Sequence, residues 1–256
     1  MMQESYTVVV AVNDSTVLQR NLFLSPGVKH DNVQLLIKRD CPSAALAYNA
    51  AIDESKNDII IFVHQDVYFP DGWFASFQQS LSYLEKEQIN WGVLGCFGSA
   101  RNRPGGVGLV CTNGMGVHGN QIQHPEPVET LDEIVLIIRK SSGLRFDPSL
   151  PHFHLYGTDI CMLAKEKGMA AYVMPAFCVH NTNQLLTLPK EFYKCYHHVK
   201  KHWRRYLPIC TSCITISRWG SEYYQRKILE FISNLLGKSR HPARRVEDPR
   251  SLLKQA

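Results

Sequence analysis

The chain has 256 residues, of which 45% are hydrophobic, and a formal net charge of +5 at pH 7. This length and composition suffice for one large α/β domain, or for one domain with a small appendage. The basic excess is concentrated after Lys190, so the chain as a whole does not have the charge pattern of a nucleic-acid-binding protein. Eight cysteines, several of them in apolar segments, do not form a disulfide framework and fit a reducing cytosol.

Neither the N-terminal residues nor the apolar segments carry a targeting or membrane signal. Residues 1–6 are polar and lead directly into a strand pattern, so we expect no signal peptide. The longest apolar segments have the length of strands, well below the ~20 residues that a membrane-spanning helix needs. We therefore expect a cytoplasmic protein.

The first third of the sequence alternates strand and helix patterns. Residues 6–12 and 33–38 are predicted strands, and Asn13-Asp14-Ser15 marks a loop and a helix N-cap between them. An alanine-rich helix follows from Ser43 to about Ser55, and five apolar residues, Ile59 to Val63, form a strand buried on both faces. This alternation predicts a parallel sheet of Rossmann-like type.

The remainder of the chain gives a less regular series of elements. Asp71 is the predicted N-cap of an amphipathic helix that contains Trp73 and Leu84. The later predictions, in chain order, are a strand at 93–97, an irregular glycine-rich segment at 95–119, a strand at 133–139, a loop at 147–154, a short helix at 158–167, a strand at 172–178, basic helical sequence after 189, and a poorly ordered tail at 240–256.

Three polar residues, His64, Gln65 and Asp66, follow the Ile59–Val63 strand directly. In open α/β sheets, ligands bind at the carboxyl ends of the strands. An acidic side chain at that edge, beside an imidazole and an amide, can reach a metal ion or a phosphate. The alternative is that Asp66 only caps a turn before Pro70, which leaves the other two polar residues unexplained.

Four segments make the chain resemble glycosyltransferases of the GT-A fold, close to the family-two type. The segments are the first strand with Asn13, the helix Ala44–Ile52 with Asn49 inside an alanine run, Val63–Val67 in place of the family's Asp-x-Asp motif, and Tyr156–Asp159 in place of its Glu-Asp motif. Together they span residues 6 to about 183. The resemblance implies a Rossmann-like GT-A fold with a mostly parallel, mixed central sheet flanked by helices. It also implies sugar transfer from a nucleotide-diphosphate donor to an acceptor hydroxyl.

The resemblance gives a role to each predicted part of the chain. Residues 1–189 are the expected catalytic domain, with a donor half at about 1–97 and an acceptor half at about 98–189. Residues 190–256 are the expected basic helical extension and tail. The acceptor would be a glycan or a lipid-linked molecule, and its identity is not encoded in any motif.

Asp66 and His180 are the predicted metal ligands. A sugar-nucleotide donor leaves a charged diphosphate behind, and a divalent cation such as Mn²⁺ or Mg²⁺ neutralises that charge. His180 resembles the histidine that often supplies a later metal contact in this fold, with an ordinary loop histidine as the alternative. The sequence departs from the family at the first acidic position of Asp-x-Asp, where His64 stands, so Asp66 is the one carboxylate of the motif.

Asp159 is the predicted catalytic base of an inverting transfer, in which a carboxylate removes the proton of the acceptor hydroxyl. It lies near the start of a predicted helix, where the helix dipole favours its ionised form. The alternative is that it only satisfies the helix N-terminus. The candidate donor contacts are Asn13, Asp40, Asn49, His64 and Gln65. Asn49 lies in a helix, where a polar side chain contacts the donor phosphate, a nearby loop, or solvent.

Asp132 and Glu133 precede the predicted strand residues Ile134–Ile138 and could orient acceptor hydroxyls or a metal-bound water. Capping of the strand is the alternative for both carboxylates.

Two other functions remain open. One is a catalytically silent protein of the same fold that binds a nucleotide sugar or a glycan. The other is a zinc-stabilised interaction module near the C-terminus, because Cys210-x-x-Cys213 follows His197, His198 and His202. The basic helix at 219–236 could pack on the domain, mediate dimerisation, or lie on a membrane beside a lipid-linked acceptor.

Overall fold

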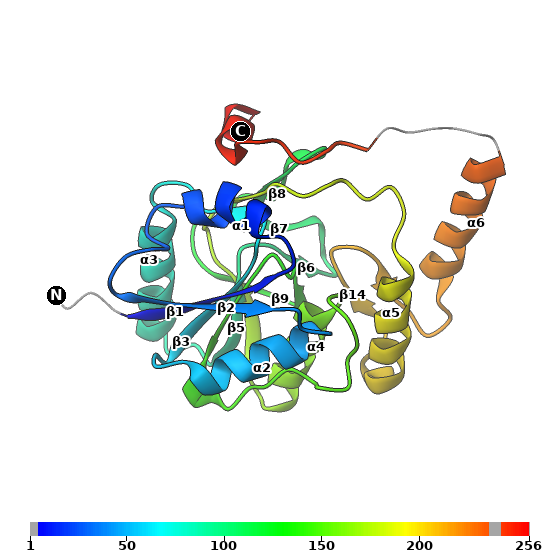
Figure 1. The fold of residues 1–256 in the computed structure, drawn as a ribbon. Helices are drawn as coiled ribbons and strands as arrows, with labels where there is room; N and C mark the ends of the chain where they lie inside the picture. Colours follow the sequence, from blue (N-terminus) through cyan, green and yellow to red (C-terminus); the bar gives the residue numbers. More distant parts are fainter. Residues whose placement is uncertain (1–4, 236–241, 256) are drawn as a thin grey trace.

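The structure, a computed structural model, describes residues 5–235 and 242–255. Its centre is a seven-stranded mixed sheet with the strand order β2-β1-β3-β11-β5-β12-β9 (Figure 1). These strands are β1 (Tyr6–Val12), β2 (Val33–Arg39), β3 (Ile59–His64), β5 (Trp91–Gly95), β9 (Glu126–Val128), β11 (Val135–Arg139) and β12 (Ala170–Val173).

The direction of the strands changes across this sheet. β1 pairs in parallel with both β2 and β3, as the alternation of strand and helix in the first third predicted. β11 runs antiparallel to its neighbours β3 and β5, whereas β12 is parallel to β5 and antiparallel to β9. The carboxyl ends of β1, β2 and β3 therefore meet at one edge, while the rest of the sheet is mixed.

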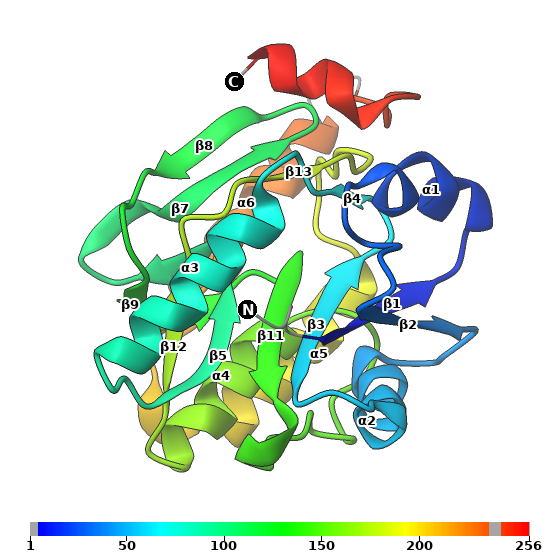
Figure 2. The same cartoon turned by 90° about the vertical axis from the view of Figure 1, so that its left-hand side faces the viewer.

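Helices cover both faces of the sheet. The helices of the described residues are α1 (Ser15–Arg20), α2 (Ala44–Glu54), α3 (Trp73–Lys86), α4 (Tyr156–Glu166), α5 (Lys190–His202) and α6 (Ser221–Leu235), of which α6 projects away from this sheet (Figure 1). Ile60 and Phe62 of β3 share one core with α2, α4 and α5, whereas Ile61 and Val63 share the other core with α3. Figure 2 shows α3 lying across one face of the sheet. Because successive strand residues point to opposite faces, the apolar run of β3 contributes to both cores.

A second sheet lies beside the first, where the sequence predicted an irregular glycine-rich segment. Its strands are β4 (Val67–Tyr68), β6 (Gly98–Ala100), β7 (Arg103–Thr112), β8 (Gly116–Asn120), β10 (Thr130–Leu131) and β13 (Cys178–His180). The prediction for 95–119 is therefore wrong. At Gly108, φ is +87°, and an added Cβ would lie 2.2 Å from the Cys96 carbonyl oxygen. Glycine at this position permits close backbone approach within a strand, rather than marking a loop.

Two further local predictions are wrong. The predicted strand at 172–178 is divided between the two sheets, because the chain leaves β12 at Val173 and begins β13 at Cys178, with Pro175 between them. A proline cannot donate a hydrogen bond to a strand ladder. At the start of α3, the N-cap is Gly72 at φ +83°, and no side chain of the described residues, Asp71 included, caps the helix.

The C-terminal segment at 242–255 is ordered, which corrects the prediction of a poorly ordered tail. Asn181 fixes it, because its side-chain amide donates to the Val246 carbonyl at 2.8 Å and accepts from the Val246 N–H at 2.9 Å. Leu252 is buried in a small core with Tyr68 and Val179. In Figure 1 this segment lies near α1 and β8, and it ends in the 3₁₀ helix Pro249–Gln255. Residues 240, 241 and 256 of the predicted tail lie outside the described residues.

Helix α6 exposes several apolar side chains, among them Tyr224, Ile228 and Ile232. Tyr223 packs instead against Tyr196, with the two rings stacked. Across the two described ranges of the chain, no helix combines the length and the apolar content that crossing a bilayer requires.

Candidate functional site

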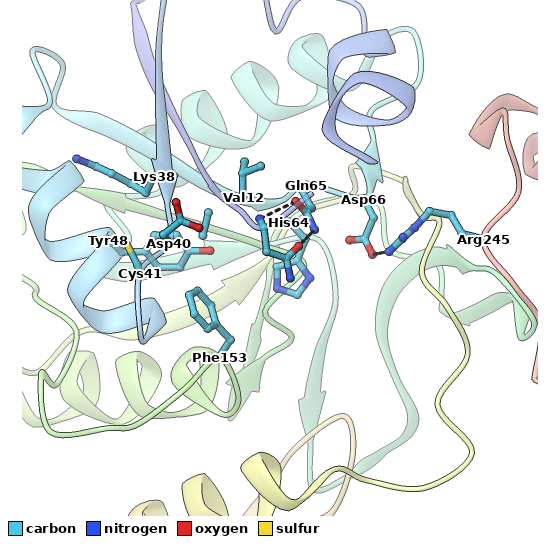
Figure 3. Close-up of a pocket in the computed structure, with 12 residues that line it drawn as sticks. Val12, Lys38, Asp40, Cys41, Tyr48, His64, Gln65, Asp66, Phe153 and Arg245 are labelled. Carbon is cyan, nitrogen blue, oxygen red and sulfur yellow. Dashed lines mark hydrogen bonds and ion pairs between the residues drawn. The ribbon is translucent and has the colours of Figure 1, made fainter. Parts of the chain in front are cut away.

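A cavity of about 330 Å³ opens at the carboxyl ends of β1, β2 and β3 (Figure 3). Ligands of open α/β folds bind at this edge. Residues from the strand ends, α2, the loop before α4 and the C-terminal segment line it: Ala11, Val12, Asn13, Lys38, Asp40, Cys41, Tyr48, His64, Gln65, Asp66, Phe153 and Arg245.

Gln65 connects the end of β3 to the loop after β1. Its side-chain oxygen accepts hydrogen bonds from the backbone N–H groups of Asn13 and Asp14, each at 3.1 Å, and its amide nitrogen donates to the Asn13 side chain. Asp14 in turn caps α1 by accepting from the N–H groups of Thr16 and Val17, which confirms the predicted N-cap. The end of β3 and the loop after β1, which both line the cavity, are therefore held together by side chains that the sequence analysis singled out.

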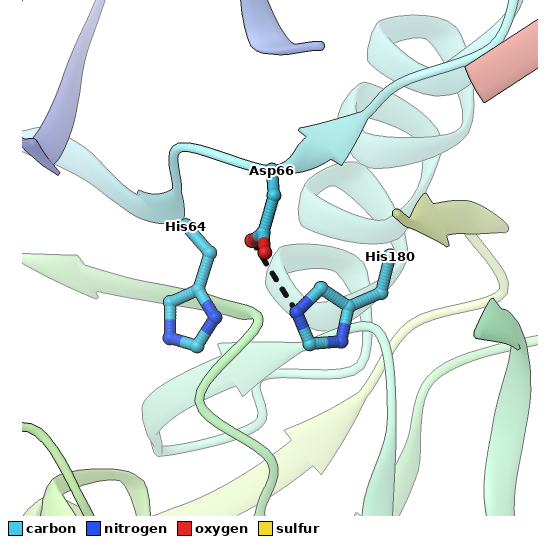
Figure 4. Close-up of side chains that lie close together, drawn as sticks. All are labelled: His64, Asp66 and His180. Carbon is cyan, nitrogen blue, oxygen red and sulfur yellow. Dashed lines mark ion pairs between the residues drawn. The ribbon is translucent and has the colours of Figure 1, made fainter. Parts of the chain in front are cut away.

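Asp66 is the centre of a charged cluster beside the cavity. Its Oδ1 lies 3.3 Å from Nε2 of His180, and its Oδ2 lies 2.8 Å from a guanidinium nitrogen of Arg245. Figure 4 shows the carboxylate pointing between the rings of His64 and His180. Ligand atoms of His64, Asp66 and His180 all lie within 4.8 Å of one another. The fold thus brings together two strand ends that are more than a hundred residues apart in the sequence.

The charges in this cluster compensate one another. Burial alone would raise the pKa of Asp66, but the imidazoles of His180 and His64 and the Arg245 guanidinium hold it well below its usual range. Burial and the neighbouring His180 lower the pKa of His64 to about 4, so His64 is neutral at pH 7. The pKa of His180 is raised, because the Asp66 carboxylate outweighs the effect of burial.

The chemistry of the cluster fits a divalent cation. One carboxylate and two imidazoles converge within 4.8 Å, where Asp66 is buried and the two histidines are partly buried. Imidazole is a better ligand for manganese and other transition metals than for magnesium. Both oxygens of Asp66 already have a partner, so a cation here would compete with Arg245 or His180 for the carboxylate.

The structure places four of the five candidate donor contacts on the cavity: Asn13, Asp40, His64 and Gln65. Asp40 adopts a left-handed backbone conformation, at φ +52°, directly after β2. Asn49 does not line the cavity. Its amide donates to the Phe146 carbonyl at 2.8 Å and accepts from the Phe146 N–H at 3.0 Å. Its side chain therefore holds a nearby loop, one of the alternatives open to a polar residue in this helix.

Asp159 lies in the first turn of α4, and its side chain is only 1% exposed. The indole N–H of Trp203 donates to its Oδ1 at 2.6 Å, whereas its Oδ2 has no hydrogen-bond partner among the described residues. Burial raises the pKa of Asp159 to about 6, even though the Trp203 bond stabilises the ionised form. Asp159 does not line the cavity, and the buried indole of Trp203 contacts its carboxylate.

Asp132 and Glu133 lie just before β11, close to Tyr156 and His64. The Tyr156 hydroxyl lies 2.7 Å from Nε2 of His64 and donates to the Glu133 carbonyl at 3.2 Å. Burial and the neighbouring Asp132 raise the pKa of Glu133 to about 8, despite hydrogen bonds from the backbone of Gly157 and Leu155. Glu133 is therefore largely protonated at pH 7 and is a poor base in this arrangement.

Arg245 is one of the cavity residues that sequence reasoning did not assign to the site. Its Nε donates to the Asn181 carbonyl at 2.7 Å, and its backbone N–H donates to the Asn183 side chain at 2.9 Å. These bonds aim the guanidinium at Asp66. Apolar residues in the same segment, Val246 and Leu252, were the signal that the tail could pack against the domain.

The predicted zinc module is not assembled. His198 and His202 lie together with Asp147, whereas neither Cys210 nor Cys213 belongs to any group of three or more possible ligands in the described part of the chain.

The sequence model of a glycosyltransferase-like family matches residues 7–203. The chain therefore belongs to this glycosyltransferase-like family. Apart from Tyr6 at the start of β1, the match covers the strands of the central sheet, and it includes His64, Asp66 and His180 but not Arg245.

Individual relatives are more distant. The "ATP synthase subunits region ORF 6" protein of Fuscovulum blasticum is 27% identical over 157 residues, which cover 60% of this chain and 62% of that protein. The chain thus spans less than two thirds of this curated relative. Among solved structures, TarS 1–349 of S. aureus is 14% identical and has a TM-score of 0.46. This match covers 77% of the present chain and 64% of TarS 1–349. The structure of TarS 1–349 in complex with UDP-GlcNAc is 11% identical and has a TM-score of 0.44. This match covers 77% of the present chain and 66% of the TarS chain. A197 from STIV is 15% identical and has a TM-score of 0.41. This match covers 66% of the present chain and 81% of A197.

Proposed function

We propose that the protein is a glycosyltransferase that moves a sugar from a nucleotide-diphosphate donor to the hydroxyl of an acceptor. The observation that supports this most is the position of the cavity, at the joint carboxyl edge of β1, β2 and β3 in a chain of this family. Charged side chains of both signs line it, as binding of a sugar and a diphosphate requires. The acceptor is a glycan or a lipid-linked molecule, and the latter would place the protein at a membrane surface.

The lining residues divide between the two ends of the donor. Asp40, after β2, would accept a hydrogen bond from the nucleotide base or ribose. Arg245 would face the diphosphate, because a guanidinium matches the geometry of phosphate oxygens. Asp66 would then lie on the diphosphate side of the cavity, where Arg245 already contacts it.

Asp66 and His180, with His64 beside them, would hold a divalent cation, Mn²⁺ in preference to Mg²⁺ because of the two imidazoles. When bound, the cation would neutralise charge on the departing diphosphate. Arg245 contributes positive charge at the same place without a metal. With His64 in place of the first carboxylate of the motif, Arg245 would therefore supply part of the positive charge that neutralises the diphosphate, and the cation would supply the rest.

Asp159 would act as the base of an inverting transfer. Its unpartnered Oδ2 and its pKa of about 6 suit a carboxylate that is ionised at pH 7 and has a free lone pair. Because Asp159 is buried and in contact with Trp203, the acceptor hydroxyl would reach it only if Trp203 moves. Until the acceptor is bound, the closed arrangement would exclude water from Asp159.

Nucleoside diphosphates are expected to stabilise the protein, and Mn²⁺ is expected to increase the effect. A ligand at 100 times its Kd stabilises by roughly 2.7 kcal/mol. For a chain of this size, that corresponds to a rise in Tm of roughly 5 °C or more. The measurement is a thermal-shift series of nucleoside diphosphates with Mn²⁺ or with EDTA. If no nucleotide changes the Tm, the donor-binding proposal is wrong. If nucleotides bind but no sugar reaches any acceptor, the catalytically silent alternative is favoured.

Asp66→Asn is expected to remove the Mn²⁺ dependence of donor binding. The amide keeps the shape but not the charge, so the affinity in the presence of Mn²⁺ should fall roughly 10- to 100-fold. The measurement is the Kd of a nucleoside diphosphate by calorimetry, with and without Mn²⁺. Asp71→Asn, which neutralises an exposed carboxylate at the start of α3, is the control. An unchanged ratio of the two Kd values in Asp66→Asn would refute the assignment of Asp66 as a ligand.

A further inference from the structure

A second group of possible metal ligands lies outside the donor cavity, between α5 and the loop that leads to α4. Oδ2 of Asp147 lies 2.9 Å from Nε2 of His198 and 3.7 Å from Nδ1 of His202. All three ligand atoms are within 4.8 Å of one another. None of these residues lines the cavity or belongs to the cluster around Asp66.

The separations agree with those of ligands around one small cation. In a tetrahedral zinc site with bonds of about 2.0–2.1 Å, neighbouring ligand atoms lie about 3.3 Å apart. The two measured distances, 2.9 Å and 3.7 Å, lie on either side of this value. His198 and His202 occupy positions i and i+4 of α5, so their rings project from the same face of the helix. Histidines at this spacing bind zinc in other helices.

The carboxylate is oriented by bonds that leave one oxygen available. Oδ1 of Asp147 accepts from the Ser149 N–H at 2.9 Å and from the Ser149 hydroxyl at 2.6 Å. Oδ2 is thereby turned toward the two imidazoles. Hydrogen bonds of this kind, behind a ligand, fix its orientation in metal sites.

An ordinary ion pair explains this arrangement less well. One protonated imidazole satisfies one carboxylate oxygen, and a second protonated imidazole on the same oxygen would repel the first. A cation between two neutral imidazoles and the carboxylate uses all three groups. The site is also open to entry of an ion, because the side chain of His202 is 43% exposed, whereas those of His198 and Asp147 are 22% and 12% exposed.

We propose that Asp147, His198 and His202 form a transition-metal site, with Zn²⁺ as the best-matched ion. Two nitrogen ligands and one oxygen ligand leave a fourth position for water or for another ligand. The ion would clamp the C-terminal end of α5 to the loop before α4. The ring of His202 lies 4.5 Å, between centroids, from that of Trp203, whose indole N–H holds Asp159. The clamp would therefore stabilise the position of Trp203 against Asp159.

Metal binding itself tests this proposal, independently of the transferase activity. The metal-free protein is titrated with Zn²⁺ by calorimetry, in the Asp66→Asn background so that the cavity cluster does not contribute. One equivalent of Zn²⁺ is expected to bind, and His198→Ala is expected to weaken this binding by more than ~100-fold. His202→Ala, at a more exposed position, gives a second variant if His198→Ala does not fold.

Matched controls separate this site from its alternatives. His197→Ala removes a histidine of the same helix that is not in the group, and it should leave Zn²⁺ binding unchanged. The double variant Cys210→Ser, Cys213→Ser should also leave it unchanged. Loss of binding in the double cysteine variant, or retention of the equivalent in both His198→Ala and His202→Ala, would overturn the proposal.

Discussion

Asp159→Asn is expected to lower the rate of sugar transfer by roughly 10²- to 10⁴-fold, the range that a positioned acid or base contributes. The amide cannot accept the proton of the acceptor hydroxyl. Binding of the nucleoside diphosphate should be unchanged, because Asp159 does not line the donor cavity. Single-turnover transfer and calorimetric donor binding, measured on the same preparation, check both parts of this expectation.

The pH profile of the wild-type enzyme gives an independent check of this base. The pKa of Asp159 is about 6, and only the ionised carboxylate can take up a proton. Transfer should therefore be constant above this pH and should fall as the pH drops through 6. Trp203→Phe removes a hydrogen bond to the ionised form, so the acidic limb of the profile should move to higher pH.

Asp132→Asn is the matched comparison, since it neutralises a neighbouring carboxylate. If Asp132→Asn loses transfer and Asp159→Asn retains it, Asp159 is not the base. Retention of activity in both variants would contradict a carboxylate mechanism based on these two residues.

Arg245→Ala is expected to raise the Kd for the nucleotide-diphosphate donor roughly 10- to 100-fold, the effect of losing a hydrogen bond to a charged group. The substitution removes a positive charge from the cavity and leaves Asp66 without one of its two partners. The remaining carboxylate would repel the diphosphate unless a metal is bound. Donor affinity should consequently depend more strongly on Mn²⁺ in this variant than in the wild type.

Arg244→Ala is the control for this experiment, because Arg244 is the adjacent arginine, is exposed and does not line the cavity. Arg245→Lys keeps the charge but loses the planar donor geometry, so an intermediate Kd is expected. Tighter donor binding in Arg245→Ala would show that Arg245 obstructs the cavity and would contradict its assignment to the diphosphate.

The sequence was informative where local patterns determine structure. The apolar run Ile59–Val63 predicts a strand buried on both faces, and the chain forms β3 there. His64 and Gln65 follow it at the carboxyl edge, and both line the cavity with Asn13 and Asp40. A strand end and its polar residues are adjacent in the chain, so their position needs no knowledge of the rest of the fold.

Contacts between distant residues could not be predicted in this way. Glycines such as Gly108 weaken a strand pattern, yet here they allow two backbones to approach within a sheet. The hydrogen bond from Trp203 to Asp159 joins the residue that follows α5 to the first turn of α4. The group around Asp147 depends on a loop that meets α5 only after folding, whereas the sequence spacing drew attention to Cys210 and Cys213.

The contact between Asp66 and Arg245 also has a consequence for folding during synthesis. The two residues are separated by 179 positions. During synthesis, β1, β2 and β3 leave the ribosome well before Arg245 does. The nascent chain can form the sheet, but its cavity has no guanidinium until residue 245 has emerged and the segment from 242 onward has docked. A nascent chain that lacks the C-terminal segment is thus expected to bind the nucleotide sugar weakly. Incompletely synthesised protein would therefore not sequester the donor.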